Sequence, residues 1–139
     1  MTKFNHEHYQ DPTPHDALAL IDKEQKTTRA YRPLVYICSP YSGNIAGNVE
    51  NARRYSRFAF EQGYIPIAPH LLFTQFLDDT NPKERELGMH FGNVLMSLCR
   101  EVWIFGDTVS AGMEAEIKRA RWKNYRLRYF NGDLEEVQK

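Results

Sequence analysis

The 139-residue sequence contains two cysteines and no apolar run that approaches the length of a membrane span. A transmembrane helix needs about 20 consecutive, mostly apolar residues, so we expect no membrane partner. The N-terminus also lacks the basic-then-apolar pattern of a secretory signal. Cys38 and Cys99 sit in apolar surroundings without the spacing of metal ligands. We therefore expect two buried, reduced thiols, no metal site and a cytoplasmic protein.

Net charge is likewise absent, because 18 lysines and arginines balance 18 aspartates and glutamates. A neutral chain is poorly suited to bulk electrostatic binding of nucleic acid or of an anionic membrane. The alternative is a nucleic-acid-binding surface of basic residues near the C-terminus, but these lack the interleaved aromatics of a recognised module. A solvated charged edge is the simpler interpretation, so we expect no nucleic-acid partner; the residues concerned are Lys118, Arg119, Arg121, Lys123, Arg126 and Arg128.

Two short segments, 34–38 (LVYIC) and 102–105 (VWIF), are apolar throughout. Such runs are typical of parallel strands that are covered on both faces. We expect a second strand at 64–68, where Pro66 favours an edge position. A last strand is expected at 125–130, whose alternating pattern favours a half-exposed edge.

Helices are expected between these strands. One spans about 48–62, a second begins at the capping sequence Asn81-Pro82-Lys83-Glu84 and continues to about Cys99, and a third begins between Ser110 and Gly112. The second should bury a stripe of Leu87, His90, Phe91, Val94, Leu95 and Leu98. An apolar loop at 71–76 can serve as a lid.

This order of elements predicts an α/β fold, namely a flavodoxin-like three-layer sandwich with a parallel sheet of about four or five strands. The length suits one domain, which we place at residues 33–139. Residues 1–32 are expected to be an N-terminal extension with a short helix that begins at Thr13-Pro14. His6 and His8 have no further ligand nearby and are expected in a solvated chain end. Residues 133–139 should form a short tail or one helical turn.

Glu116 is the most informative residue. It falls on one helical stripe with Met113, Ile117 and Ala120, which are apolar or small. Burying a carboxylate is costly unless it has a task, and parallel sheets bind ligands beyond the carboxyl ends of their strands. The alternative is that Glu116 lies at the edge of the stripe and reaches water.

The loop after the first strand, S-P-Y-S-G, joins a strand to a helix N-terminus, an arrangement that favours anions. It matches neither a Walker loop nor G-x-G-x-x-G, and serine and glycine also occur in such loops simply to turn the chain. His70, just past the second strand, is a candidate acid–base group or a structural histidine.

Four motifs occur in order: Y-I-C-S-P-Y (36–41), G-Y-I-P-I-A-P-H (63–70), C-R-E-V-W-I-F-G (99–106) and S-A-G-M-E-A-E-I-K-R-A (110–120). Over about residues 34–130 the chain resembles the nucleoside 2-deoxyribosyltransferase-like superfamily. It is most similar to an uncharacterised bacterial and phage branch of DUF4406 type, related to the 2'-deoxynucleoside 5'-monophosphate N-glycosidases. The four motifs together are more specific than any one of them.

The resemblance implies that Glu116 attacks the anomeric carbon of a 2-deoxyribosyl group in a retaining, two-step reaction. It implies that Tyr36 orients this nucleophile and that Ser110 contacts a 5'-phosphate, as in the nucleotide-hydrolase branch. The resemblance also implies a nucleoside or nucleotide substrate, no cofactor, and a homodimer or higher homo-oligomer. The predicted substrate-binding residues are Ser39, Pro40, Tyr41, Ser42, Gly43, Ser110, Gly112 and Met113.

Asn93 departs from the pattern, because the relatives carry an aspartate there that handles the proton of the departing base. An amide can hydrogen-bond a base but cannot deliver a proton. His70 or Asp107 can take over this role, so the candidate catalytic residues are Glu116, Tyr36, Asn93 and His70. We expect N-glycosidic bond chemistry, by transfer or by hydrolysis. The alternative is a non-catalytic nucleotide-binding or regulatory module on the same fold.

Overall fold

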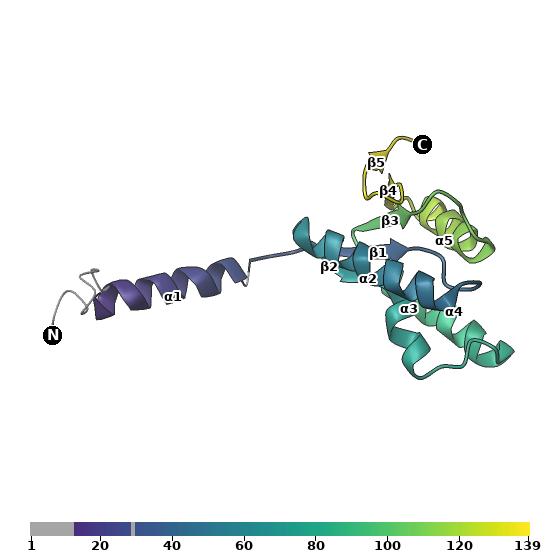
Figure 1. The fold of residues 1–139 in the computed structure, drawn as a ribbon, viewed down its shortest axis with the longest axis horizontal. Coiled ribbons are helices and arrows are strands. Elements are labelled where there is room, and N and C mark those ends of the chain that lie inside the picture. Colours follow the sequence, from purple (N-terminus) through teal and green to yellow (C-terminus); the bar gives the residue numbers. More distant parts are fainter. Residues whose placement is uncertain (1–12, 29) are drawn as a thin grey trace. The chain divides into compact units, whose positions relative to one another are not determined.

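The computed structural model describes residues 13–28 and 30–139, which belong to two units, residues 1–31 and 32–139 (Figure 1). The first unit contains helix α1 (Pro14–Thr28). The hydroxyl of Thr13 accepts a hydrogen bond from the backbone N–H of Asp16 at 3.1 Å and so caps this helix. His6 and His8 lie outside the described residues.

The second unit is a five-stranded sheet flanked by helices, which confirms the predicted flavodoxin-like α/β fold. The strand order is β2-β1-β3-β4-β5; the first four are parallel, and β5 pairs antiparallel with β4. The elements are β1 (Leu34–Cys38), α2 (Ile45–Glu61), β2 (Ile65–Ile67), α3 (Pro69–Leu72), the 3-10 turn η1 (Phe73–Gln75), α4 (Pro82–Met96), β3 (Glu101–Phe105), α5 (Ala111–Trp122), β4 (Arg126–Phe130) and β5 (Glu136–Val137).

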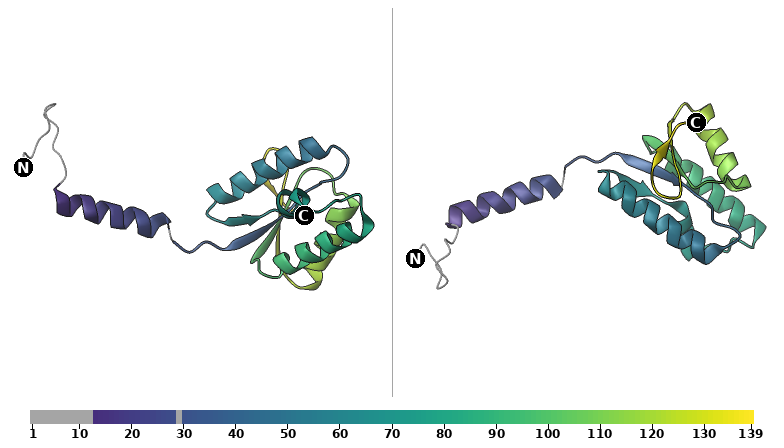
Figure 2. Two further views of the ribbon diagram at one scale, coloured as in Figure 1. Left: turned by 90° about the horizontal axis from the view of Figure 1, so that it is seen from below. Right: turned by 45° about the horizontal axis from the view of Figure 1, so that its top comes forward.

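Helices cover both faces of the sheet, which makes three layers (Figure 2). Because side chains alternate along a strand, Val35 and Ile37 of β1 pack against α2, whereas Tyr36 and Cys38 face α4 and α5. Both cysteines are buried and free, as predicted. Tyr36 therefore reaches the side of the sheet where α5 carries Glu116.

The edges of the sheet agree only in part with expectation. The strand with Pro66 is an edge strand, as predicted. The expectation of an edge strand at 125–130 was wrong, because β5 pairs with β4 and covers it. The expected helical turn at 133–139 is likewise absent. Instead, Leu134 adopts a φ of 65° and the chain reverses into β5.

Helix α4 turns a different face inward from the one predicted. Gly92 and Met96 are buried, whereas Leu87, Val94 and Leu98 are 48%, 48% and 64% exposed. Gly92 packs so closely on Tyr36 that an added Cβ would lie 3.2 Å from its hydroxyl, so only glycine fits without displacing the tyrosine. The expected apolar loop at 71–76 is also wrong, since α3 and η1 occupy it.

A buried carboxylate, Glu101, lies at the first residue of β3, at the end of the sheet where its parallel strands begin. It accepts hydrogen bonds from the Tyr64 hydroxyl and the Trp103 indole, both at 2.9 Å. Arg128 lies 3.7 Å from it and forms a two-bond pair with Glu136 at 2.8 and 2.9 Å. Removal of the carboxylate leaves the buried indole N–H of Trp103 and the Tyr64 hydroxyl without this acceptor, whereas Arg128 keeps its pair with Glu136.

We expect Glu101→Ala to lower the free energy of unfolding by about 3 kcal/mol, as breaking a buried ion pair typically does. Glu61→Ala is the control, because it removes an exposed pair with Arg57 on α2 and should cost less than about 1 kcal/mol. Urea denaturation of both variants measures the difference. Equal losses would show that Glu101 has no special structural role.

Candidate functional site

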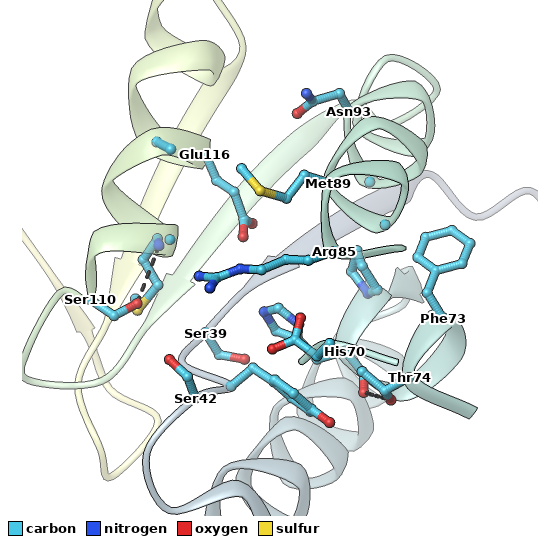
Figure 3. A pocket seen from close by; sticks show the side chains of 18 of the residues that line it. Ser39, Ser42, His70, Phe73, Thr74, Arg85, Met89, Asn93, Ser110 and Glu116 are labelled. Carbon is cyan, nitrogen blue, oxygen red and sulfur yellow. Dashed lines mark hydrogen bonds between the residues drawn. The ribbon is translucent and has the colours of Figure 1, made fainter. Parts of the chain in front are cut away.

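A pocket of about 350 Å³ lies where the chain leaves β1, between α3, α4 and the first turns of α5 (Figure 3). All predicted site residues line it except Pro40 and Gly43. Gly43 adopts a φ of 95°, so its role is to turn the loop. Asp107, a proposed substitute acid, is exposed and does not line this pocket. The lining residues from the predicted set are Tyr36, Ser39, Tyr41, Ser42, His70, Asn93, Ser110, Gly112, Met113 and Glu116.

Glu116 projects from α5 into the pocket (Figure 3). Its neighbours on the stripe, Met113 and Ile117, are buried, which fixes the direction of its side chain. Tyr36 and Cys38 of β1 act on this carboxyl group, and the Cys38 thiol also donates to the backbone carbonyl of Met113 at 3.9 Å. Burial raises the pKa of Glu116 to about 7, and Tyr36 and Cys38 act in the opposite direction. The carboxyl group is thus poised to change its charge near neutral pH.

Tyr36 is the main partner of this carboxylate. Its side chain is 2% exposed. Its pKa is raised well above the ordinary value, first by burial and then by the charge and hydrogen bond of Glu116. The phenol therefore stays protonated, so it can donate its hydrogen to Glu116. The thiol of Cys38 also stays protonated, because burial and then Glu116 raise its pKa.

The N-terminus of α5 forms one side of the pocket. The Ser110 hydroxyl caps this helix by accepting the backbone N–H of Met113 at 3.2 Å. The position where a Cβ of Gly112 would lie has no heavy atom within 4 Å, so the helix start is open on that side. The unpaired N–H groups and the dipole of such an end favour a negative charge.

His70 lies on the side of the pocket opposite α5. Its ring stacks on Tyr41, with centroids 5.0 Å apart, and hydrogen-bonds to the backbone of Ser39. Burial lowers the pKa of His70, and Asp79 and the Ser39 backbone partly offset this effect. The imidazole is therefore neutral near pH 7 and is better suited to accept a proton than to donate one.

Asn93 projects from α4, across the pocket from α5 (Figure 3). Its side chain has no hydrogen-bond partner among residues 13–28 and 30–139. The amide is therefore available to a ligand both as a donor and as an acceptor.

Several lining residues were not predicted: Phe73, Thr74, Leu77, Asp79, Glu84, Arg85, Met89 and Arg119. Those on α4 were missed because the helix was expected to bury its leucines. A usable signal was present, since Gly88 and Gly92 are four residues apart and mark a face that permits close approach. Arg85, Met89 and Asn93, also four apart, flank that face.

Within the described residues, no group of three or more metal-ligating side chains is close enough to hold an ion. No described helix combines the length and the apolar character that a membrane span requires.

The fold of this chain is similar to that of a solved enzyme structure. A solved structure of a 2-deoxyribosyltransferase from Bacillus psychrosaccharolyticus superposes with a TM-score of 0.61 at 11% identity, covering 76% of this chain and 77% of that chain. The shared property is the flavodoxin-like fold of that enzyme. No curated protein matches the sequence.

The chain belongs to the DUF7768 family, described as a domain of unknown function, whose model matches residues 33–130. This family description names no activity. The structural neighbour supports the predicted fold, whereas the superfamily expected from the motifs and its DUF4406-type branch stay predictions.

Proposed function

We propose that this protein cleaves the N-glycosidic bond of a 2'-deoxynucleotide or a related nucleoside, with Glu116 as the nucleophile. The observation that carries the proposal is a carboxylate turned into a pocket, with a pKa raised by burial to about 7, beside a buried tyrosine that stays protonated. The fold shared with a 2-deoxyribosyltransferase supports it.

The first step forms a bond between a carboxylate oxygen of Glu116 and the anomeric carbon. The bond from that carbon to the base nitrogen breaks, and its electron pair leaves with the base. Tyr36 holds the attacking carboxylate in place by its hydrogen bond. Asn93 hydrogen-bonds the departing base, which takes its proton from water because an amide cannot supply one.

The second step releases the sugar. Water or another base attacks the anomeric carbon, and the ester bond to Glu116 breaks and restores the carboxylate. Neutral His70 lies in the same pocket and accepts the proton that an attacking water loses. Two displacements at one carbon give retention of configuration.

A screen of deoxynucleosides and their 5'-monophosphates tests the proposal, with released base measured by chromatography. A non-catalytic nucleotide-binding module is the second candidate, favoured by the amide at Asn93 in place of an acid. Release of free base from any member of the panel would contradict this second candidate. Binding without release from every member would contradict the first.

We expect Asn93→Asp to raise the rate of base release, because it places a carboxyl group where the departing base needs a proton. General acid–base catalysis typically contributes about 10²–10⁴-fold, and we expect an increase of at least about 10-fold for a side chain not optimised as an acid. Single-turnover base release measures it. An unchanged or lower rate would show that Asn93 does not contact the leaving base.

The homo-oligomer implied by the resemblance also remains a proposal. The exposed Leu87 and Val94 of α4, and Leu98 just after its end, are compatible with it, since exposed apolar side chains often mark an interface. Light scattering of the purified protein measures its oligomeric state directly.

A further inference from the structure

We propose that Gly92 of α4 is a positioning residue for the reaction. By leaving room for the hydroxyl of Tyr36 against α4, it fixes that hydroxyl beside the carboxyl group of Glu116. The inference rests on the proposed function, in which Glu116 is the nucleophile. It adds a residue that touches no reacting atom and acts through the tyrosine.

The contact between Gly92 and Tyr36 joins α4 to β1 at the pocket, which both residues line. A Cβ at position 92 would lie 3.2 Å from the Tyr36 hydroxyl oxygen and 3.9 Å from side-chain carbons of Pro69. The second distance is an ordinary van der Waals separation, whereas the first is too short for one. The hydroxyl therefore has to move if a side chain is added at Gly92.

The rest of Tyr36 is held in place, so the displacement falls on its ring and hydroxyl. Its strand β1 pairs with β2 on one side and with β3 on the other, where Tyr36 lies opposite Ile67 and Val102. The side chain belongs to a buried core cluster that also contains Met96 of α4. Such a close-packed interior transmits a displacement instead of absorbing it.

A displaced hydroxyl changes the surroundings of Glu116. Tyr36 and Cys38 lower the pKa of this carboxyl group, against the larger effect of burial. If the hydroxyl moves away, one of these two donors is lost and the pKa rises above about 7. At neutral pH, fewer molecules then carry the ionised carboxylate that attacks the anomeric carbon.

The other titratable groups of the pocket do not set this pKa. They come from the β1–α2 loop, α3, α4, α5 and the segment before α4, and the pKa of Glu116 has no contribution from them: Tyr41, His70, Asp79, Glu84, Arg85 and Arg119. A change in the titration of Glu116 therefore reports on its two partners from β1.

Gly88 provides the matched control. It lies one turn before Gly92 on α4 and also lines the pocket. A Cβ there would lie 3.6 Å from Cδ1 of Leu77, which is an ordinary contact with a flexible side chain. Gly88→Ala thus makes the same chemical change in the same helix, with the same gain in helix propensity, but without a contact to Tyr36.

The test follows the titration of Glu116 by NMR of protein with isotope-labelled glutamate carboxyl carbons, and Glu116→Gln identifies the signal. We expect Gly92→Ala to raise the titration midpoint by about one pH unit, as loss of a hydrogen bond to a charged group predicts. Gly88→Ala should leave the midpoint at the wild-type value. The pH at which kcat/KM for base release reaches half its maximum should shift in the same way. A Gly92→Ala midpoint equal to that of wild type would overturn the inference.

Tyr36→Phe tests the same point if Gly92→Ala disturbs the fold, because it removes the hydroxyl that the new Cβ would meet. Alone, Tyr36→Phe should raise the midpoint at least as much as Gly92→Ala does. Addition of Gly92→Ala should then change the midpoint no further, because two changes that act through one group are not additive. A further shift in the double variant would show that Gly92 acts by a route other than Tyr36, against the inference.

The titration needs no substrate, so it separates this inference from the proposed reaction. If the midpoint depends on Gly92 through Tyr36 but no substrate of the panel releases base, the positioning role stands and the proposed reaction fails. If base is released while the midpoint and the pH profile of Gly92→Ala match those of wild type, the reaction stands and Gly92 has no positioning role.

Discussion

Glu116→Gln is expected to lower the rate of base release by about 10³-fold or more while the nucleotide still binds. Loss of an activated nucleophile typically causes a reduction of this size. Glutamine keeps the volume and can still accept the hydrogen of Tyr36, but its amide is a poor nucleophile. Single-turnover chromatography measures the rate, and calorimetry measures the binding.

Glu114→Gln is the matched control for this experiment. It neutralises a carboxylate on the same helix, but Glu114 is exposed and does not line the pocket. Its rate should equal that of the wild-type protein. If the Glu116→Gln variant releases base as fast as the control, Glu116 is not the nucleophile.

Glu116→Gln is also expected to stabilise the protein above neutral pH. Burial raises the pKa of Glu116 from 4.5 to about 7, so the folded state binds this proton more tightly than the unfolded state. The stability that the protonated carboxyl supports is fully present below pH 4.5 and is lost as the pH rises through 7. Each pKa unit corresponds to about 1.4 kcal/mol, so the loss amounts to about 3 kcal/mol at pH 8.

Glutamine removes this penalty because it cannot ionise. Urea denaturation should show Glu116→Gln more stable than wild type by about 2–3 kcal/mol at pH 8 and nearly equal to it at pH 4. Such a gain is typical of residues that serve function at the expense of stability. A variant that is equally stable or less stable at pH 8 would show that the carboxylate is not held in an unfavourable environment.

The central strands were predictable because burial on both faces demands uninterrupted apolar residues, as in Leu34–Cys38 and Val102 to Phe105. The start of α5 was predictable because Ser110 has a side chain that caps a helix. The direction of Glu116 followed from its helical spacing to Met113 and Ile117. These are local properties of short segments, so the sequence alone contains them.

The remaining features depend on contacts between distant segments. The two-residue strand β5 has no periodicity of its own and exists because β4 offers it an unpaired edge. The inward face of α4 is set by the approach of Tyr36 to Gly92, which lie far apart in the sequence. Arg85 was missed for the same reason, since its helix had been assigned the wrong buried face.

The most direct measurement is mass spectrometry of a trapped glycosyl-enzyme. A nucleotide with fluorine at the 2' position disfavours the cationic transition state and lets the covalent intermediate accumulate after the base has left. Trypsin then releases the peptide 101–118, which contains Glu116. We predict a sugar adduct on Glu116 in the wild-type protein and none in Glu116→Gln. Base release with no adduct, or an adduct on another residue, would contradict the account.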